Sequence, residues 1–203
     1  MTLILGLTGG IASGKSTVSR FLAARGAVVE DGDLVARRLV RPHSAGLARL
    51  VAVFGSGILD DRGQLKRAEL GRQVFGNPVA EAKLNAALSP LIHREILFDL
   101  HQARLARVPL VVLDLPLLYE GGYQDQCDAV MVVTVSPATQ LARLMARNGY
   151  DRETAKRRIA AQWPLAKKAA LADVVIDNEG SRAATEAQVL TWLARWWRRR
   201  SSK

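Results

Sequence analysis

Cysteine is nearly absent from this chain of 203 residues, since Cys127 is its only one. That scarcity excludes an internal disulfide framework and a zinc site made of several cysteines, and it fits a reducing compartment. The first residues also lack the basic segment of a signal peptide. They lead directly into an apolar, strand-like run. We therefore expect a cytoplasmic protein.

Long apolar runs are missing as well. A membrane-spanning helix needs about 20 consecutive, mainly apolar residues, whereas the apolar run 109–119 is interrupted by Asp114. We therefore expect no membrane partner. Proline is scarce, at 7 residues, and 49% of the chain is hydrophobic against 24% charged. This balance is typical of a globular protein and excludes a largely disordered chain.

Acidic residues are the minority among the charged ones. Lysine and arginine number 29, aspartate and glutamate 19, and the net charge is +10. Such an excess predicts anionic partners, namely nucleotides or other phosphates, nucleic acid, or an acidic membrane surface. The tail 192–200 mixes tryptophan with arginine. Trp192 and Trp196 stand four residues apart, however, as in a last helix packed on a sheet, so we expect no nucleic acid partner.

Short apolar runs alternate with helical patterns along the chain. Helical periodicity fits residues 15–25, 137–147 and 182–199. Five apolar runs between these patterns are typical of strands buried on both faces of a parallel sheet: Leu3–Leu7, Ala27–Val29, Leu110–Leu113, Val130–Val135 and Val174–Ile176. The alternation predicts an α/β fold.

Two elaborations interrupt this alternation. Residues 34–108 are far more than a crossover between parallel strands needs, and much of the stretch is helical in pattern. Helix starts are expected at Asn77-Pro78 and at Ser89-Pro90. We interpret 34–108 as an inserted helical domain and the basic stretch 148–172 as a lid. The core then consists of the remaining segments 1–33, 109–147 and 173–203.

The strongest chemical signal is the segment Gly-Gly-Ile-Ala-Ser-Gly-Lys-Ser at 9–16, which fits the phosphate-binding pattern G-x-x-x-x-G-K-[ST]. It follows an expected strand and opens an expected helix, so backbone N–H groups can converge on phosphate oxygens. We expect Lys15 to bridge the terminal phosphates of ATP and Ser16 to offer its hydroxyl to Mg²⁺. The expected nucleotide-binding residues are Gly10, Ala12, Ser13, Gly14, Lys15, Ser16 and Thr17.

Carboxylates follow two of the expected strands. Asp33 lies where open α/β sheets bind ligands, and transfer of a phosphoryl group to an alcohol needs a carboxylate that accepts the hydroxyl proton. The alternative for the pair Asp31 and Asp33 is a helix N-cap without chemistry. Asp114 is expected to hold Mg²⁺ or its waters, with a plain strand-ending aspartate as the alternative. Glu120 is a weaker candidate.

Cations gather near the expected lid. Residues 140–170 contain eight lysines and arginines against two acidic residues. Arg143 and Arg147 stand four residues apart and so share one helix face. A kinase needs a lid that excludes water and cations that meet the developing negative charge. We therefore expect these two arginines to be catalytic, with a solvated basic helix as the alternative.

These motifs and their order resemble the dephospho-coenzyme A kinases over nearly the whole chain. The resemblance implies a P-loop NTPase-type three-layer fold with a five-stranded parallel sheet, a helical coenzyme A-binding domain and a lid. It implies that ATP phosphorylates the ribose 3′-hydroxyl of dephospho-coenzyme A, the last step of coenzyme A biosynthesis. The resemblance rests on residues 6–17, 31–33, 63–67, Leu70, 74–75, 77–78, 116–118, Glu120, Gln140, Arg143, Arg147 and 172–180.

The resemblance also implies roles for single residues. It makes Asp33 the base and Lys15 and Arg143 the cations that stabilise the transition state. It places Asn178 near the ATP base, and the residues that it implies near the acceptor are Thr8, Asp33, Arg67 and Leu117.

The chain departs from the family pattern at two positions. Ala12 replaces a frequent glycine of the phosphate loop, where it needs a permitted φ. Ser89 stands where the family usually has histidine before Pro90. Another small-molecule or nucleoside monophosphate kinase on the same core remains the alternative. A GTP-dependent switch is disfavoured, because the chain contains no Asn-Lys-x-Asp motif for guanine.

Overall fold

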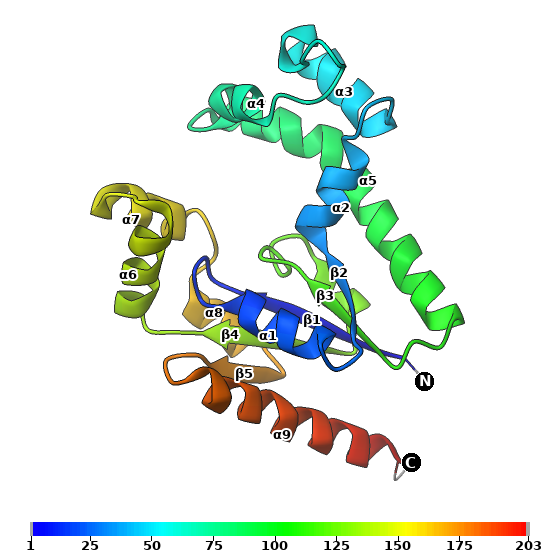
Figure 1. The fold of residues 1–203 in the computed structure, drawn as a ribbon, viewed down its shortest axis with the longest axis vertical. Coiled ribbons are helices and arrows are strands. Elements are labelled where there is room, and N and C mark those ends of the chain that lie inside the picture. Colours follow the sequence, from blue (N-terminus) through cyan, green and yellow to red (C-terminus); the bar gives the residue numbers. More distant parts are fainter. Residues whose placement is uncertain (1, 202–203) are drawn as a thin grey trace. The chain divides into compact units, whose positions relative to one another are not determined.

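The computed structural model describes the backbone of residues 2–201 and the side chains of residues 2–198. The side chains of Arg199 and Arg200 in the basic tail therefore lie outside the described part. The chain divides into two compact units, whose elements are coloured along the sequence in Figure 1. The first unit comprises Met1–Val29 and Ala103–Lys203, and the second comprises Glu30–Gln102.

A five-stranded sheet, in the order β2-β3-β1-β4-β5, is the framework of the first unit. β1 pairs in parallel with β3 and with β4, and β4 pairs in parallel with β5. Each predicted strand overlaps an observed one, so the predicted α/β fold is confirmed. The strands are β1 (Leu3–Gly9), β2 (Val28–Asp31), β3 (Leu110–Asp114), β4 (Ala129–Thr134) and β5 (Val174–Asp177).

Two helices cover one face of this sheet: α1 (Lys15–Ala23) and α9 (Arg182–Ser201). Leu5 and Leu7 of β1 pack there against Phe21 of α1. Trp192 and Trp196 of α9 pack on the same core, with their ring centroids 5.3 Å apart. The expected packing of the last helix on the sheet is therefore confirmed.

The opposite face carries the segment 115–128, which includes the short helix η2 (Tyr123–Gln126). Gly6 of β1 has no room for a side chain, because an ideal Cβ would lie 2.8 Å from both Cys127 Sγ and Leu118 Cδ1. Burial raises the pKa of the Cys127 thiol to about 12. The helix α8 (Leu165–Ala170) also contacts β4. The first unit thus consists of three layers.

Side-chain caps set the start of the two helices that follow β4, which are α6 (Pro137–Asn148) and α7 (Arg152–Ala160). Ser136 Oγ accepts a hydrogen bond from the Thr139 N–H at 3.1 Å and so caps α6. Gly149, at φ 66°, ends that helix. Asp151 Oδ1 accepts from the Thr154 N–H at 2.7 Å and caps α7. Each cap satisfies an N–H that has no partner inside the helix.

The second unit is helical and has its own apolar core, which includes Leu50, Ile58 and Leu70. It contains α2 (Gly32–Leu39), α3 (Ala45–Phe54), the short helix η1 (Ser56–Ile58), α4 (Arg67–Val74) and most of α5 (Pro78–Leu105). In the described part of the chain, no helix is both long and apolar enough to span a bilayer.

The helix start predicted at Ser89-Pro90 is wrong, because α5 runs without interruption from Pro78 to Leu105. A proline inside a helix leaves the carbonyl four residues earlier without its N–H partner. Here that carbonyl belongs to Ala86, which is exposed like Pro90, so water can satisfy it. The start predicted at Asn77-Pro78 is confirmed, since Asn77 Oδ1 accepts from the Ala80 N–H at 3.1 Å.

Candidate active site

The phosphate loop joins the end of β1 to the start of α1. Gly9 ends β1, and an ideal Cβ on it would lie 2.5 Å from Ser13 Oγ and 2.7 Å from the Val133 carbonyl oxygen. Gly14, at φ 91°, is the N-cap of α1 and carries no side chain to cap the helix. The first N–H groups of α1 therefore stay available to an anion.

Ala12 lies in the left-handed region at φ 61°. This conformation costs an L-residue roughly 1–2 kcal/mol, whereas glycine adopts it without that cost. The departure from the family pattern at this position is therefore accommodated with strain in the backbone.

Lys15 Nζ contacts Asp114 Oδ1, the carboxylate of the last residue of the inner strand β3. The parallel register sets Leu7 of β1 opposite Asp114 of β3, so the carboxylate lies beside the strand that leads into the loop. The Asp114 side chain is only 6% exposed. A buried carboxylate needs a partner, and the loop lysine supplies it.

Asn178 follows β5 and contacts the phosphate loop from inside the protein. Its Nδ2 donates to the Ser13 carbonyl at 2.8 Å, and its Oδ1 accepts from Thr185 Oγ1 at 2.8 Å. The residue is 7% exposed. A Cβ on Gly14 would collide with Asn178 Nδ2. The Asn178 amide is thus bonded to protein on both sides, and it holds the loop in place.

The two arginines that are expected to be catalytic differ in their surroundings. Arg143 Nη2 donates to the Asn178 carbonyl at 3.0 Å. Its Nη1 lies 3.8 Å from the position that a Cβ on Gly14 would take. Arg147 is exposed, and its Nε donates to Asn148 Oδ1 at 2.8 Å. The structure therefore brings Arg143, one turn earlier on α6, to the loop.

Two residues expected near the acceptor lie on the same side of the sheet but differ in exposure. Thr8 is fully buried, and its Oγ1 donates to the Pro116 carbonyl at 3.1 Å. Leu117, the next residue of that segment, is 49% exposed. The exposed side chain of this pair, and not the threonine hydroxyl, is available to a ligand.

Asp31 and Asp33, both in the second unit, differ in their structural roles. Asp31 is the N-cap of α2, and its Oδ1 accepts from the N–H groups of Asp33 and Leu34 at 2.8 and 3.3 Å. Asp33 occupies the first turn with an exposed side chain. The capping role expected as an alternative therefore falls to Asp31, which leaves the Asp33 carboxylate open to a substrate. Arg67 is also exposed and opens α4.

An ion cluster forms around Arg38 of α2. Its Nη2 lies 3.6 Å from Glu30 Oε1, 3.3 Å from Glu95 Oε1 and 2.5 Å from Asp99 Oδ2. Burial and the neighbouring Asp99 carboxylate raise the pKa of Glu30 to about 7. One arginine thus faces three acidic groups, of which one is only half ionised near neutral pH.

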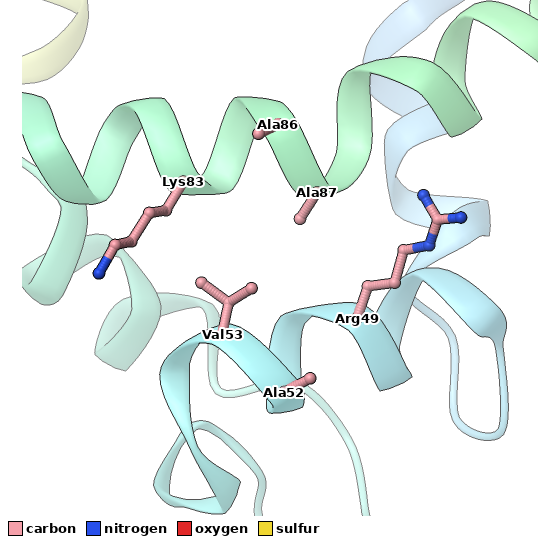
Figure 2. A pocket seen from close by; sticks show the side chains of 6 residues that line it. All are labelled: Arg49, Ala52, Val53, Lys83, Ala86 and Ala87. Carbon is pink, nitrogen blue, oxygen red and sulfur yellow. The ribbon is translucent and has the colours of Figure 1, made fainter.

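A pocket of about 620 Å³ lies between α3 and α5 of the second unit (Figure 2). Small apolar side chains form its walls, namely those of Ala52, Val53, Ala86 and Ala87. Arg49 and Lys83 border it on α3 and α5. Apolar walls flanked by two cations suit a ligand that is apolar in part and carries negative charge.

Comparison with known proteins decides the family. A family model described as dephospho-CoA kinase matches residues 3–184 of the chain. The chain belongs to the dephospho-CoA kinase family. A dephospho-CoA kinase from Latilactobacillus sakei subsp. sakei is 50% identical over 193 residues, which cover 95% of each chain.

Two solved structures share the fold of this chain. The protein TT1252 from Thermus thermophilus is 31% identical, with a TM-score of 0.81, covering 96% of this chain and 97% of that one. A dephospho-CoA kinase from Campylobacter jejuni, 23% identical with a TM-score of 0.68 over 96% of this chain and 97% of that one, shares the fold.

The role of Lys168 was not expected from the sequence. Lys168 is one of the eight cations of residues 140–170, but its side chain is 0% exposed. Lys168 Nζ donates to the Pro116 carbonyl at 2.7 Å and pairs with Glu120 Oε1 at 2.8 Å. One signal was available, because Glu120 follows the apolar segment 115–119 and a carboxylate there needs a cation.

Proposed function

We propose that this chain transfers the γ-phosphoryl group of ATP to the ribose 3′-hydroxyl of dephospho-coenzyme A, giving coenzyme A and ADP. The observation that carries the proposal is the match to the dephospho-CoA kinase family over residues 3–184. The phosphate loop of the first unit supports it, because its N–H groups and Lys15 suit a nucleoside triphosphate.

Two cations beside the loop stabilise the transferred group in this proposal. Lys15 opens α1, and the Arg143 guanidinium lies next to Gly14. Phosphoryl transfer spreads negative charge over the phosphoryl oxygens, and fixed cations lower its energy. The contact of Lys15 with Asp114 and that of Arg143 with the Asn178 carbonyl orient both cations.

Asp33 is the base in this proposal. Its exposed carboxylate accepts the proton of the ribose 3′-hydroxyl while that oxygen forms its bond to phosphorus. The neighbouring Asp31 supports the assignment, because it caps α2 and so leaves the Asp33 carboxylate without a structural task.

Ser16 and Asp114 would hold Mg²⁺. Hydroxyl and carboxylate oxygens are ligands that Mg²⁺ prefers, and kinases complete the shell with substrate phosphates and water. The described side chains contain no cluster of three His, Cys, Asp or Glu residues suited to a metal ion. When bound, Mg²⁺ neutralises charge on the phosphate oxygens.

The helical unit binds dephospho-coenzyme A in this proposal. Its exposed cations support the assignment, since the acceptor carries a diphosphate: Arg67 opens α4, and Arg49 and Lys83 border the pocket of Figure 2. The apolar walls of that pocket suit the uncharged arm of the same molecule.

Product analysis tests the proposed reaction. Purified protein is incubated with ATP, Mg²⁺ and either dephospho-coenzyme A, shikimate or a nucleoside monophosphate. We expect ADP and a product heavier by about 80 mass units, one phosphoryl group, with dephospho-coenzyme A only. A Lys15→Ala preparation made in parallel controls for a contaminating kinase. Phosphorylation of shikimate or a nucleoside monophosphate in its place would overturn the assignment of the acceptor.

A further inference from the structure

Both backbone polar groups of Ile11, the third residue of the phosphate loop, are held by glutamine side chains. The Ile11 N–H donates to Gln162 Oε1 at 2.8 Å, and Gln140 Nε2 donates to the Ile11 carbonyl at 2.9 Å. Gln140 lies on α6, and Gln162 lies in the turn between α7 and α8. The loop is therefore fastened to the segment expected to form the lid.

The side chains that hold the loop fill the space beside Gly10. An ideal Cβ on Gly10 would lie 2.5 Å from Gln140 Nε2 and 3.6 Å from Leu165 Cδ2. The next residue but one, Ala12, is held in the left-handed region at φ 61°. A non-glycine residue keeps such a conformation only where its surroundings impose it. The two glutamines fix the peptide groups that lead into Ala12, so they supply that constraint.

The residue that follows Gln162 is held by an ion pair whose lysine, Lys168, is fully buried. The N–H of this residue, Trp163, donates to Glu120 Oε1 at 3.0 Å, and the same oxygen contacts Lys168 Nζ at 2.8 Å. Lys168 also donates to the Pro116 carbonyl, which accepts a further hydrogen bond from Thr8 of β1. The segment 162–168 is thus attached to the loop at one end and to the sheet layer at the other.

We propose that Gln162 is a positioning residue for phosphoryl transfer, which sets the phosphate loop through the Ile11 N–H and is kept there by the buried Lys168–Glu120 pair. The proposal rests on the proposed kinase function. It assigns the segment 162–168 to the fixed framework of the nucleotide site. Any movement of α7 would then reach the loop through Gln162.

The decisive variant is Gln162→Met, which keeps the length of the side chain and removes the acceptor. Loss of one hydrogen bond to a partly buried donor such as the Ile11 N–H corresponds to about a tenfold change in an equilibrium constant. We expect the KM for ATP and the Kd for ADP to rise about tenfold, with the KM for dephospho-coenzyme A unchanged. Hydrogen exchange of the Ile11 amide becomes faster by a similar factor, whereas β1 amides exchange as before.

Two further variants separate positioning from a general loss of structure. Gln162→Glu keeps an acceptor oxygen at the same reach, so the slow exchange of the Ile11 amide returns. Lys168→Met leaves Glu120 without its cation and weakens ADP binding. Lys167→Met is the matched control, because the neighbouring Lys167 is exposed and only lies over the Trp163 ring; it binds ADP as the unmodified protein does.

The outcomes distinguish this proposal from the proposed function. If Gln162→Met speeds exchange at Ile11 but binds ADP with unchanged affinity, the glutamine is merely structural and the positioning role is overturned. If Gln162→Met raises the KM for dephospho-coenzyme A as much as that for ATP, the role is also overturned. If the unmodified protein fails to phosphorylate dephospho-coenzyme A, the acceptor assignment fails, while the Kd for ADP still decides the role of Gln162.

Discussion

The two units differ in whether they bury polar side chains. All eight buried polar or charged residues among the described side chains lie in the first unit, and they include Ser13, Gln140, Lys168 and Asn178. The second unit has an apolar core, and its expected site residue Asp33 stands on the surface. A loop that must point several N–H groups at one phosphate chain needs a rigid support. A base that meets its substrate needs only to be accessible.

The largest effect should come from the exposed side of this comparison. Asp33→Asn keeps the size of the side chain and removes its capacity to accept a proton. We expect kcat to fall on the order of 10²–10⁴-fold, the usual scale for loss of a general base. Stability and ADP affinity should change little, because the residue is exposed and Asp31 provides the cap. Unchanged turnover in a steady-state assay would remove Asp33 from the mechanism.

A buried residue of the first unit should show the reverse pattern. Asn178→Ala leaves the Ser13 carbonyl without its side-chain donor, and it leaves the buried Thr185 hydroxyl with only its longer bond, at 3.3 Å, to the Ser181 carbonyl. An unsatisfied buried group costs about 1–3 kcal/mol, so we expect unfolding in urea to show a loss of about 2 kcal/mol together with a higher KM for ATP. The exposed residue Asn85 supplies the control, since Asn85→Ala should stay within about 0.5 kcal/mol. Equal losses in both variants would contradict the comparison.

The strain at Ala12 permits a stabilising change within the rigid loop. Ala12→Gly relieves the left-handed conformation at φ 61° but adds freedom to the unfolded chain. We expect a net gain of about 0.5–1 kcal/mol, seen as a rise of a few degrees in Tm. Ala142→Gly, at an exposed position of α6, should have the opposite sign. A lower Tm for Ala12→Gly would show that the loop is not strained there.

A pH-dependent effect is expected at the ion cluster of the second unit. Glu30 has a pKa of about 7 in the folded protein against an ordinary 4.5, so the folded state binds its proton more tightly than the unfolded state. The stability that this carboxyl contributes is present below the ordinary pKa and is lost as the pH rises through 7. The glutamine of Glu30→Gln stays neutral at every pH. The free energy of unfolding of this variant, relative to that of the unmodified protein, should therefore increase between about pH 5 and pH 8. A constant difference between the two would contradict the raised pKa.

The sequence predicted those features that depend on local pattern. Apolar runs located all five strands, and the glycines of the phosphate loop located the nucleotide site, because both are encoded in neighbouring residues. Lys168 and Gln162 escaped notice because their partners, Glu120 and Ile11, are far away in the chain. The helix start at Pro90 was predicted wrongly for a related reason, since an exposed proline is tolerated inside a long, well-packed helix. Whether a polar group is buried, and whether a helix tolerates a proline, both depend on tertiary packing and not on local pattern.

The single cysteine of this chain permits selective labelling at an introduced cysteine. Cys127 packs against Gly6, and its raised pKa of about 12 leaves almost no thiolate at neutral pH. Maleimide and iodoacetamide are electrophiles that react with the thiolate, so they would leave the native cysteine largely unmodified. A cysteine introduced at an exposed site such as Arg152 of α7 would react selectively. Spin labels or fluorophores on α7, which belongs to the segment expected to form a lid, can therefore test whether that segment moves when ATP binds.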